Sequence, residues 1–187
     1  MKVIELNENK KKNILENLLK RSPQQYEAYA DTVNEIIKDI RENGDKALFA
    51  YTKKFDKADI NPSNIKVTEE EIERAYKELD GDIIDVIKKA KVNIEAFHVK
   101  QKQNSWIDTS NEGIILGQKI TPIEKVGVYV PGGTAAYLST VLMDIIPAKV
   151  AGVKHIIMVT PPGENGNVYA GTLVAAKEAG VTEIYKA

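Results

Sequence analysis

The chain has 187 residues, no cysteine and a formal net charge of −1, with 26 Lys and Arg against 27 Asp and Glu. This balance gives no reason to expect nucleic acid or an anionic membrane as a partner. The lack of cysteine excludes disulfides and thiolate metal sites, and no apolar run approaches the roughly 18 residues of a membrane span. The N-terminal residues do not resemble a secretory signal, so we expect a cytoplasmic location.

Charge and glycine divide the sequence into two regions. Residues 1–104 hold 40 of the 53 charged side chains, whereas residues 105–187 hold 10 of the 12 glycines. The first pattern is typical of solvated helices, and the second is typical of a buried α/β sheet with tight turns. We therefore predict a helical N-terminal region at 1–104 and a partial Rossmann-like nucleotide-binding domain at 105–187.

Helix boundaries in the first region are marked by capping residues. Ser22 and Thr68 each begin a capping box, with Gln or Glu three residues later. The first predicted helix runs to about residue 42 and stops at Gly44, and a second covers 46–55. Further helices are predicted from Thr68 to about 79 and from 82 to about 103.

From Trp106 onward the pattern becomes that of strands and crossover helices. A strand or hairpin arm is expected at 113–120, followed by strands at 126–130, 154–159 and 182–186, with helices at 137–150 and 167–179 between them. This order is that of parallel βαβ units. The fold class is therefore α/β, with an N-terminal helical segment followed by an incomplete Rossmann-like parallel sheet.

The turns after the first two parallel strands are the candidate ligand site, because open parallel sheets bind ligands beyond the carboxyl ends of their strands. Pro131-Gly132-Gly133 lets a ligand approach the backbone, and Tyr129 can stack on a ring. Thr160-Pro161 ends the next strand and is a candidate cofactor wall. From spacing alone, tight structural turns and a sheet-packing tyrosine remain the alternative.

Other polar residues give weaker signals. His98 lies within a predicted helix and His155 begins a strand, and neither has partners that indicate metal binding. No paired nucleophile and base are found, so no catalytic residue is predicted. Trp106 lies between the two regions and is expected to fill their junction.

Short motifs spread along the chain in one order resemble the histidinol dehydrogenase family. They are Gly44 to Leu48, Phe55-Asp56, Phe97-His98 with Gln101 and Trp106, Gly113, Leu116 to Gln118, Val126 to Gly133, Val141 to Met143, Ile146 to Val153 and Pro161-Pro162. The match to Tyr-Val-Pro-Gly-Gly together with Pro-Ala-Lys-Val-Ala-Gly-Val is highly specific.

The resemblance implies an NAD-dependent, zinc-requiring homodimer that oxidises L-histidinol through the aldehyde to L-histidine. It places Tyr129 against NAD, with Pro131, Gly132 and Gly133 in the loop around it and Thr160 and Pro161 at the next strand end. The family's zinc ligands, catalytic Glu-His pair and substrate-binding residues lie beyond the length of this chain. We therefore expect an N-terminal portion of the enzyme, with no zinc ligand and no activity on its own.

Two other functions remain open on the sequence. The chain could be a stand-alone nucleotide-binding module without catalysis, or a helical interaction protein whose α/β region is only a support. A sheet that stops after its third parallel strand is expected to expose an open edge, which favours a homo-oligomer.

Overall fold

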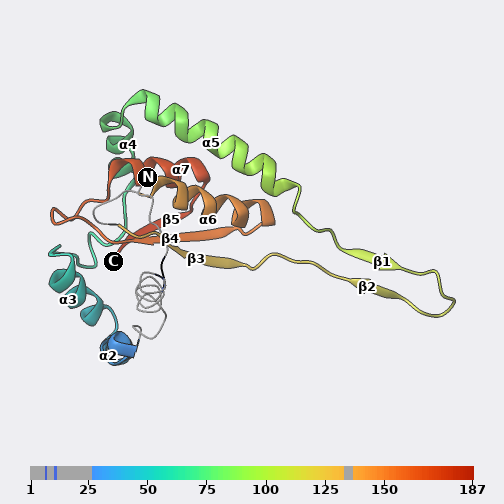
Figure 1. Ribbon diagram of the computed structural model, residues 1–187, viewed down its shortest axis with the longest axis horizontal. Helices are drawn as coiled ribbons and strands as arrows, with labels where there is room; N and C mark the ends of the chain where they lie inside the picture. The colour runs from blue at the N-terminus through green and yellow to red at the C-terminus, as the bar shows by residue number, and fades with distance from the viewer. Residues whose placement is uncertain (1–6, 8–10, 12–26, 133–136) are drawn as a thin grey trace. The chain divides into compact units, whose positions relative to one another are not determined.

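A computed structural model describes residues 7, 11, 27–132 and 137–187, and the chain divides into the units 1–48 and 49–187 (Figure 1). The first unit contains α2, Glu27–Asn43, and the start of α3, Asp45–Phe55. Gly44 separates the two helices with a φ of +56°, a left-handed conformation that suits glycine. The predicted stop at this residue is confirmed. The predicted cap at Ser22 lies outside the described residues.

The second unit is built around a parallel sheet. Its strands β3 (Lys125–Tyr129), β4 (His155–Thr160) and β5 (Glu183–Lys186) lie in the order β3-β4-β5, with Val128 opposite Met158 and Met158 opposite Ile184. The crossover helices are α6, Leu138–Ala151, and α7, Ala170–Ala179. Both crossovers advance the sheet in the same direction, and Figure 1 shows α6 and α7 on one face. The α/β class predicted from the sequence is confirmed.

The core lies between this sheet face and the helices. Ile156, Met158 and Ile184 from the sheet are almost fully buried, as are Val141 and Ile145 of α6. Burying each such side chain contributes about 1.5–3 kcal/mol. Helices α6 and α7 end at Gly152 and Gly180, whose φ values of +97° and +92° complete left-handed C-caps.

Two helices from the charged region join the same core. α4, Glu69–Glu78, begins with the predicted capping box: Thr68 Oγ1 accepts from the Glu71 amide, and the Glu71 carboxylate accepts from the Thr68 amide. α5, Gly81–Val99, follows after the Asp80 cap. Ile72, Ala75 and Ile87 of these helices pack in one core with the sheet residues. The core therefore contains residues from both of the regions predicted from the sequence, 1–104 and 105–187.

The edge of the sheet beyond β5 is not open. The Val67 amide donates to the Ile184 carbonyl at 2.9 Å, and the Lys186 amide donates to the Ile65 carbonyl at 2.8 Å. Lys66 thereby pairs antiparallel with Tyr185. The expected open edge is therefore wrong at β5, because a segment far earlier in the sequence supplies its hydrogen bonds. Among the described strands of the parallel sheet, β3 is the one whose outer edge is left unpaired.

Before β3, the chain forms a hairpin arm. β1 (Trp106–Asp108) pairs antiparallel with β2 (Leu116–Gln118), and Figure 1 shows the arm extending away from the helices and sheet of its unit. Trp106 lies on β1 with 54% of its surface exposed. The prediction that it fills the junction of the two regions is wrong, since its indole N–H instead donates to Gln118 Oε1 across the arm at 3.2 Å.

Candidate functional site

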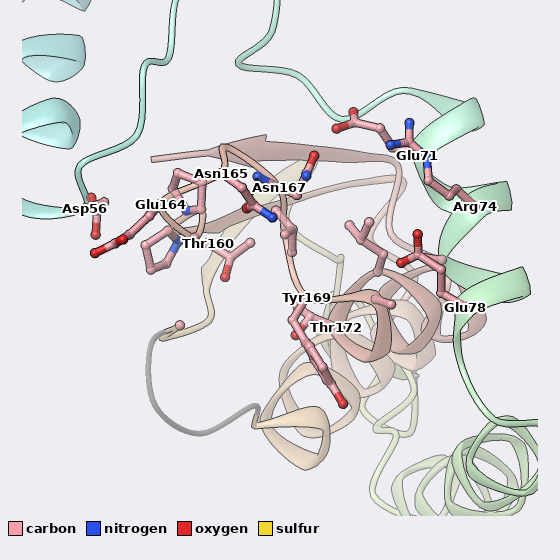
Figure 2. A pocket seen from close by; sticks show the side chains of 18 of the residues that line it. Asp56, Glu71, Arg74, Glu78, Thr160, Glu164, Asn165, Asn167, Tyr169 and Thr172 are labelled. Atoms are coloured by element: carbon pink, nitrogen blue, oxygen red, sulfur yellow. Dashed lines mark hydrogen bonds between the residues drawn. The ribbon is translucent and has the colours of Figure 1, made fainter.

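The carboxyl ends of the parallel strands open into a pocket of about 1180 Å³ (Figure 2). Tyr129 lines it as the last residue of β3, with Pro131 and Gly132 just beyond, and Thr160 lines it as the last residue of β4, with Pro161 next to it. These are five of the six residues that the sequence singled out as cofactor-binding. Gly133, the sixth, lies outside the described residues. The structure thus brings the two strand-end turns together in one cavity, as expected for a parallel sheet.

Tyr129, the last residue of β3, lines this pocket, and the strand alternation sets the face of the sheet to which its side chain points. Val128 is half-buried and Val130 is fully buried on the helix-covered face, whereas Tyr129 points to the other face and is 62% exposed. A sheet-packing tyrosine would be buried. The exposed ring is available for stacking on a planar ligand.

Gly132 is required by the contact between the two turns. A Cβ built at this position would lie 2.8 Å from Pro161 Cγ and 3.1 Å from the Pro161 carbonyl oxygen. Real Cβ atoms do not approach so closely, so any side chain here would push the turns apart. The glycine therefore has a packing role that is independent of any ligand.

Thr160 forms part of the pocket floor. Its side chain is 2% exposed, and its carbonyl accepts from the Ala187 amide at 3.1 Å. These contacts fix the carboxyl end of β4 against that of β5. Thr160 is therefore a buried lining residue, while Pro161 is half-buried and Tyr129 is exposed.

Helix α7 begins at the same pocket, with Ala170 and Thr172 in the lining. Tyr169 occupies its N-cap position without a side-chain cap hydrogen bond. The Thr172 and Leu173 amides donate to the Tyr169 carbonyl at 3.0 and 3.2 Å, so the amides of Ala170 and Gly171 are the ones that have no carbonyl within the helix to bond, at the positive end of the helix dipole. The start of α7 can therefore donate hydrogen bonds to an anionic or polar ligand group.

The opposite wall comes from α4 and was not predicted from the sequence. Figure 2 shows Glu71, Arg74 and Glu78 along this helix, facing the side of the pocket formed by the sheet and α7. Glu71 is paired with the buried ammonium of Lys186 on β5. The local sequence pattern does not predict this wall of the pocket, because the wall depends on how α4 packs on α7.

Two further carboxylates, Asp56 and Glu164, lie across the pocket from α4. Glu164 accepts from the Lys57 ammonium at 3.0 Å. Partial burial raises the pKa of the Asp56 carboxyl above its ordinary value. Carboxylates of this kind accept hydrogen bonds from ligand hydroxyls, as in the ribose contacts of dinucleotide sites.

The histidines lie away from this arrangement. His98 Nδ1 lies 2.7 Å from Gln101 Oε1 at the end of α5, and His155 is exposed at the start of β4. In the part of the chain that the structure describes, no group of three or more His, Cys, Asp or Glu is arranged to hold a metal ion. Among those same residues, no helix is long and apolar enough to cross a membrane.

Together, the fold and pocket define an α/β protein with a pocket at the carboxyl ends of a parallel sheet. Comparison with known proteins gives the particular family: the profile of histidinol dehydrogenase matches residues 19–187. The chain belongs to the histidinol dehydrogenase family, and the resemblance recognised in its sequence is confirmed.

Individual relatives show the same match over part of their length. The histidinol dehydrogenase of Clostridium acetobutylicum is 54% identical over 155 residues, covering 83% of this chain and 36% of the relative. That of Geobacillus kaustophilus is 51% identical over 154 residues, again covering 36% of the relative. The crystal structure of histidinol dehydrogenase from Elizabethkingia anophelis matches with a TM-score of 0.79 and 43% identity, over 85% of this chain and 36% of that chain. The chain thus spans about a third of the length of these relatives.

Proposed function

We propose that this chain forms one wall of the NAD site of a histidinol dehydrogenase, and that oxidation of L-histidinol to L-histidine through the aldehyde requires the remainder of a family-length protein. The observation that carries the proposal is the convergence of the turns after β3 and β4 with the start of α7 in one pocket. Bound NAD would supply the hydride acceptor for each of the two oxidations.

The described residues fit one face of a dinucleotide. Tyr129 offers an exposed ring for stacking, and the close approach of Gly132 and Pro161 leaves a backbone surface without a protruding side chain. The uncapped start of α7 suits a phosphate group. Glu78 and Asp56 lie on the two sides of the pocket, where carboxylates can accept from ribose hydroxyls.

Zinc, which the family resemblance implies, does not fit the described residues of this chain. They contain no cluster of ligands for a metal ion, and neither histidine lines the pocket. We therefore assign these residues to binding and orienting the cofactor, and we assign none of them to proton transfer from the alcohol. The purified chain should form no NADH with L-histidinol, NAD and zinc; steady NADH formation, followed by absorbance, would contradict this division of roles.

The binding proposal is tested by calorimetric titration of the chain with NAD. Loss of a stacked ring costs about 1.4 kcal/mol, so Tyr129→Ala should weaken binding about tenfold. Tyr29→Ala is the matched control, since Tyr29 has a similar exposure of 67% but does not line the pocket. Equal affinity in the wild type and in Tyr129→Ala would overturn the placement of NAD against this ring.

A further inference from the structure

The hairpin arm, residues 104–124, has an apolar surface that this chain leaves uncovered. Every residue from 101 to 125 is exposed. Seven large hydrophobic side chains lie on the arm: Trp106, Ile107, Ile114, Ile115, Leu116, Ile120 and Ile123. Ile107 and Ile115 are 75% and 76% exposed. Contiguous apolar surface of this kind on a soluble chain marks an interaction site.

Both faces of the arm carry this apolar character. In the register of β1 and β2, Trp106 lies opposite Gln118 and Ile107 lies opposite Gly117. Neighbouring residues of a strand point to opposite faces, so Trp106 and Ile107 lie on different sides of the ribbon. The Ile107 side chain covers Gly117, where an added Cβ would lie 3.3 Å from Ile107 Cγ1. A covering partner would therefore bury Trp106 on one face and Ile107 on the other.

The arm has little internal support. Its ladder consists of two three-residue strands, supplemented by the Trp106–Gln118 hydrogen bond and by bonds between Ser105 Oγ and the Ile120 backbone. A two-stranded hairpin is at best marginally stable in water unless a third strand or another element packs on it. The unpaired outer edges of β1 and β2 also leave backbone groups to which an incoming strand can add.

We propose that the arm is the docking surface for the part of the histidinol dehydrogenase fold that lies outside the region matched by this chain. Relatives extend well beyond the match, which covers 36% of their length, and the fold of this chain is retained within such a longer chain at a TM-score of 0.79. Packing of the arm against the arm of a second copy of this chain is disfavoured by charge. The arm carries three carboxylates, Asp108, Glu112 and Glu124, and one cation, Lys119.

The test is co-expression of the tagged chain with the part of the Clostridium acetobutylicum relative that lies outside its match. The double variant Ile107→Asp/Ile115→Asp places two charges on the apolar surface. Thr109→Asp/Asn111→Asp adds the same charge at polar positions of the arm and is the matched control. Circular dichroism and thermal unfolding show that each variant keeps the fold of the sheet and helices. This inference rests on the family membership and not on NAD binding, so the capture is measured without NAD.

Capture of the relative's segment by the wild type and the control, with about a hundredfold weaker capture by the double variant, supports the proposal. Equal capture by all three chains overturns it, and so does a complex of two copies of this chain held through the arm. Should the segment not fold when expressed separately, it is joined to this chain and amide hydrogen exchange is measured. Slower exchange at Trp106–Asp108 and Leu116–Gln118 in the joined protein supports docking, and unchanged exchange overturns it.

Discussion

The buried ion pair between Glu71 and Lys186 is expected to stabilise the contact of α4 with the sheet. The Lys186 side chain is 5% exposed and that of Glu71 is 17% exposed. Glu71 Oε2 also accepts from the Thr68 amide at 2.8 Å, so the pair joins the end of β5 to the cap of α4. Lys186→Met removes the ammonium while keeping much of the apolar stem.

The expected loss of stability follows from the burial of the remaining charge. Removing one partner of a buried pair costs about 3–5 kcal/mol, because the other charge is left without compensation. Glu71 keeps its bond to the Thr68 amide, so the loss of stability in Lys186→Met should lie near the lower end of this range, at about 3 kcal/mol. Glu71→Gln strands the more buried ammonium and should cost at least as much. The double variant should lose about 2 kcal/mol less stability than the sum of the two single losses, since neither charge remains.

A neighbouring pair supplies the control. Lys177 on α7 contacts Glu69 in the same first turn of α4 at 2.7 Å, but the two side chains are 45% and 69% exposed. Exposed pairs contribute about 0–1 kcal/mol, so Lys177→Met should have a small effect. Urea unfolding followed by circular dichroism gives the free energy of each variant. Equal costs for Lys186→Met and Lys177→Met would refute the reasoning from burial.

Three further predictions concern the pocket and its supports. Gly132→Ala should destabilise the chain by about 1–3 kcal/mol, because the added Cβ clashes with Pro161. Gly127→Ala is the control, since a Cβ there would meet nothing within 4 Å, and thermal unfolding compares the two variants. Thr68→Ala should cost about 1 kcal/mol of unfolding free energy by removing the α4 cap, while Ser63→Ala serves as the comparison outside a helix cap. Burial, together with the hydrogen bond to Glu178, raises the pKa of Tyr76 above its ordinary 10.0. The stability that the neutral Tyr76 hydroxyl contributes is therefore fully present below pH 10.0 and is lost as the pH rises above that value. The free energy of unfolding, measured across this pH range, should fall less in Tyr76→Phe.

Local signals in the sequence were sufficient for most elements of the fold. The capping box at Thr68 and the stop at Gly44 marked helix ends because they act within a few residues. Strands β3, β4 and β5 were found from short apolar runs that end in turns. The position of Tyr129 at a strand's carboxyl end was enough to predict that it would lie at the pocket formed by the strand ends.

Long-range contacts explain what the sequence did not show. The pairing of Ile65 and Val67 with β5 joins residues more than a hundred positions apart, and no periodicity signals it. The α4 wall of the pocket has the same origin. Trp106 was misplaced because an aromatic residue between two regions suggests burial, whereas the arm that carries it has no partner among the described residues.

The most direct measurement of cofactor binding is a map of NAD on the backbone amides of the chain by nuclear magnetic resonance. Perturbed amides should cluster at Tyr129, Val130 and Gly132, at Thr160 and Gly163, and at 170–172, where the two turns and the start of α7 meet; the prolines between them carry no amide hydrogen. Perturbations confined to the arm or to α5, or none at saturating NAD, would show that the strand ends do not form the dinucleotide surface.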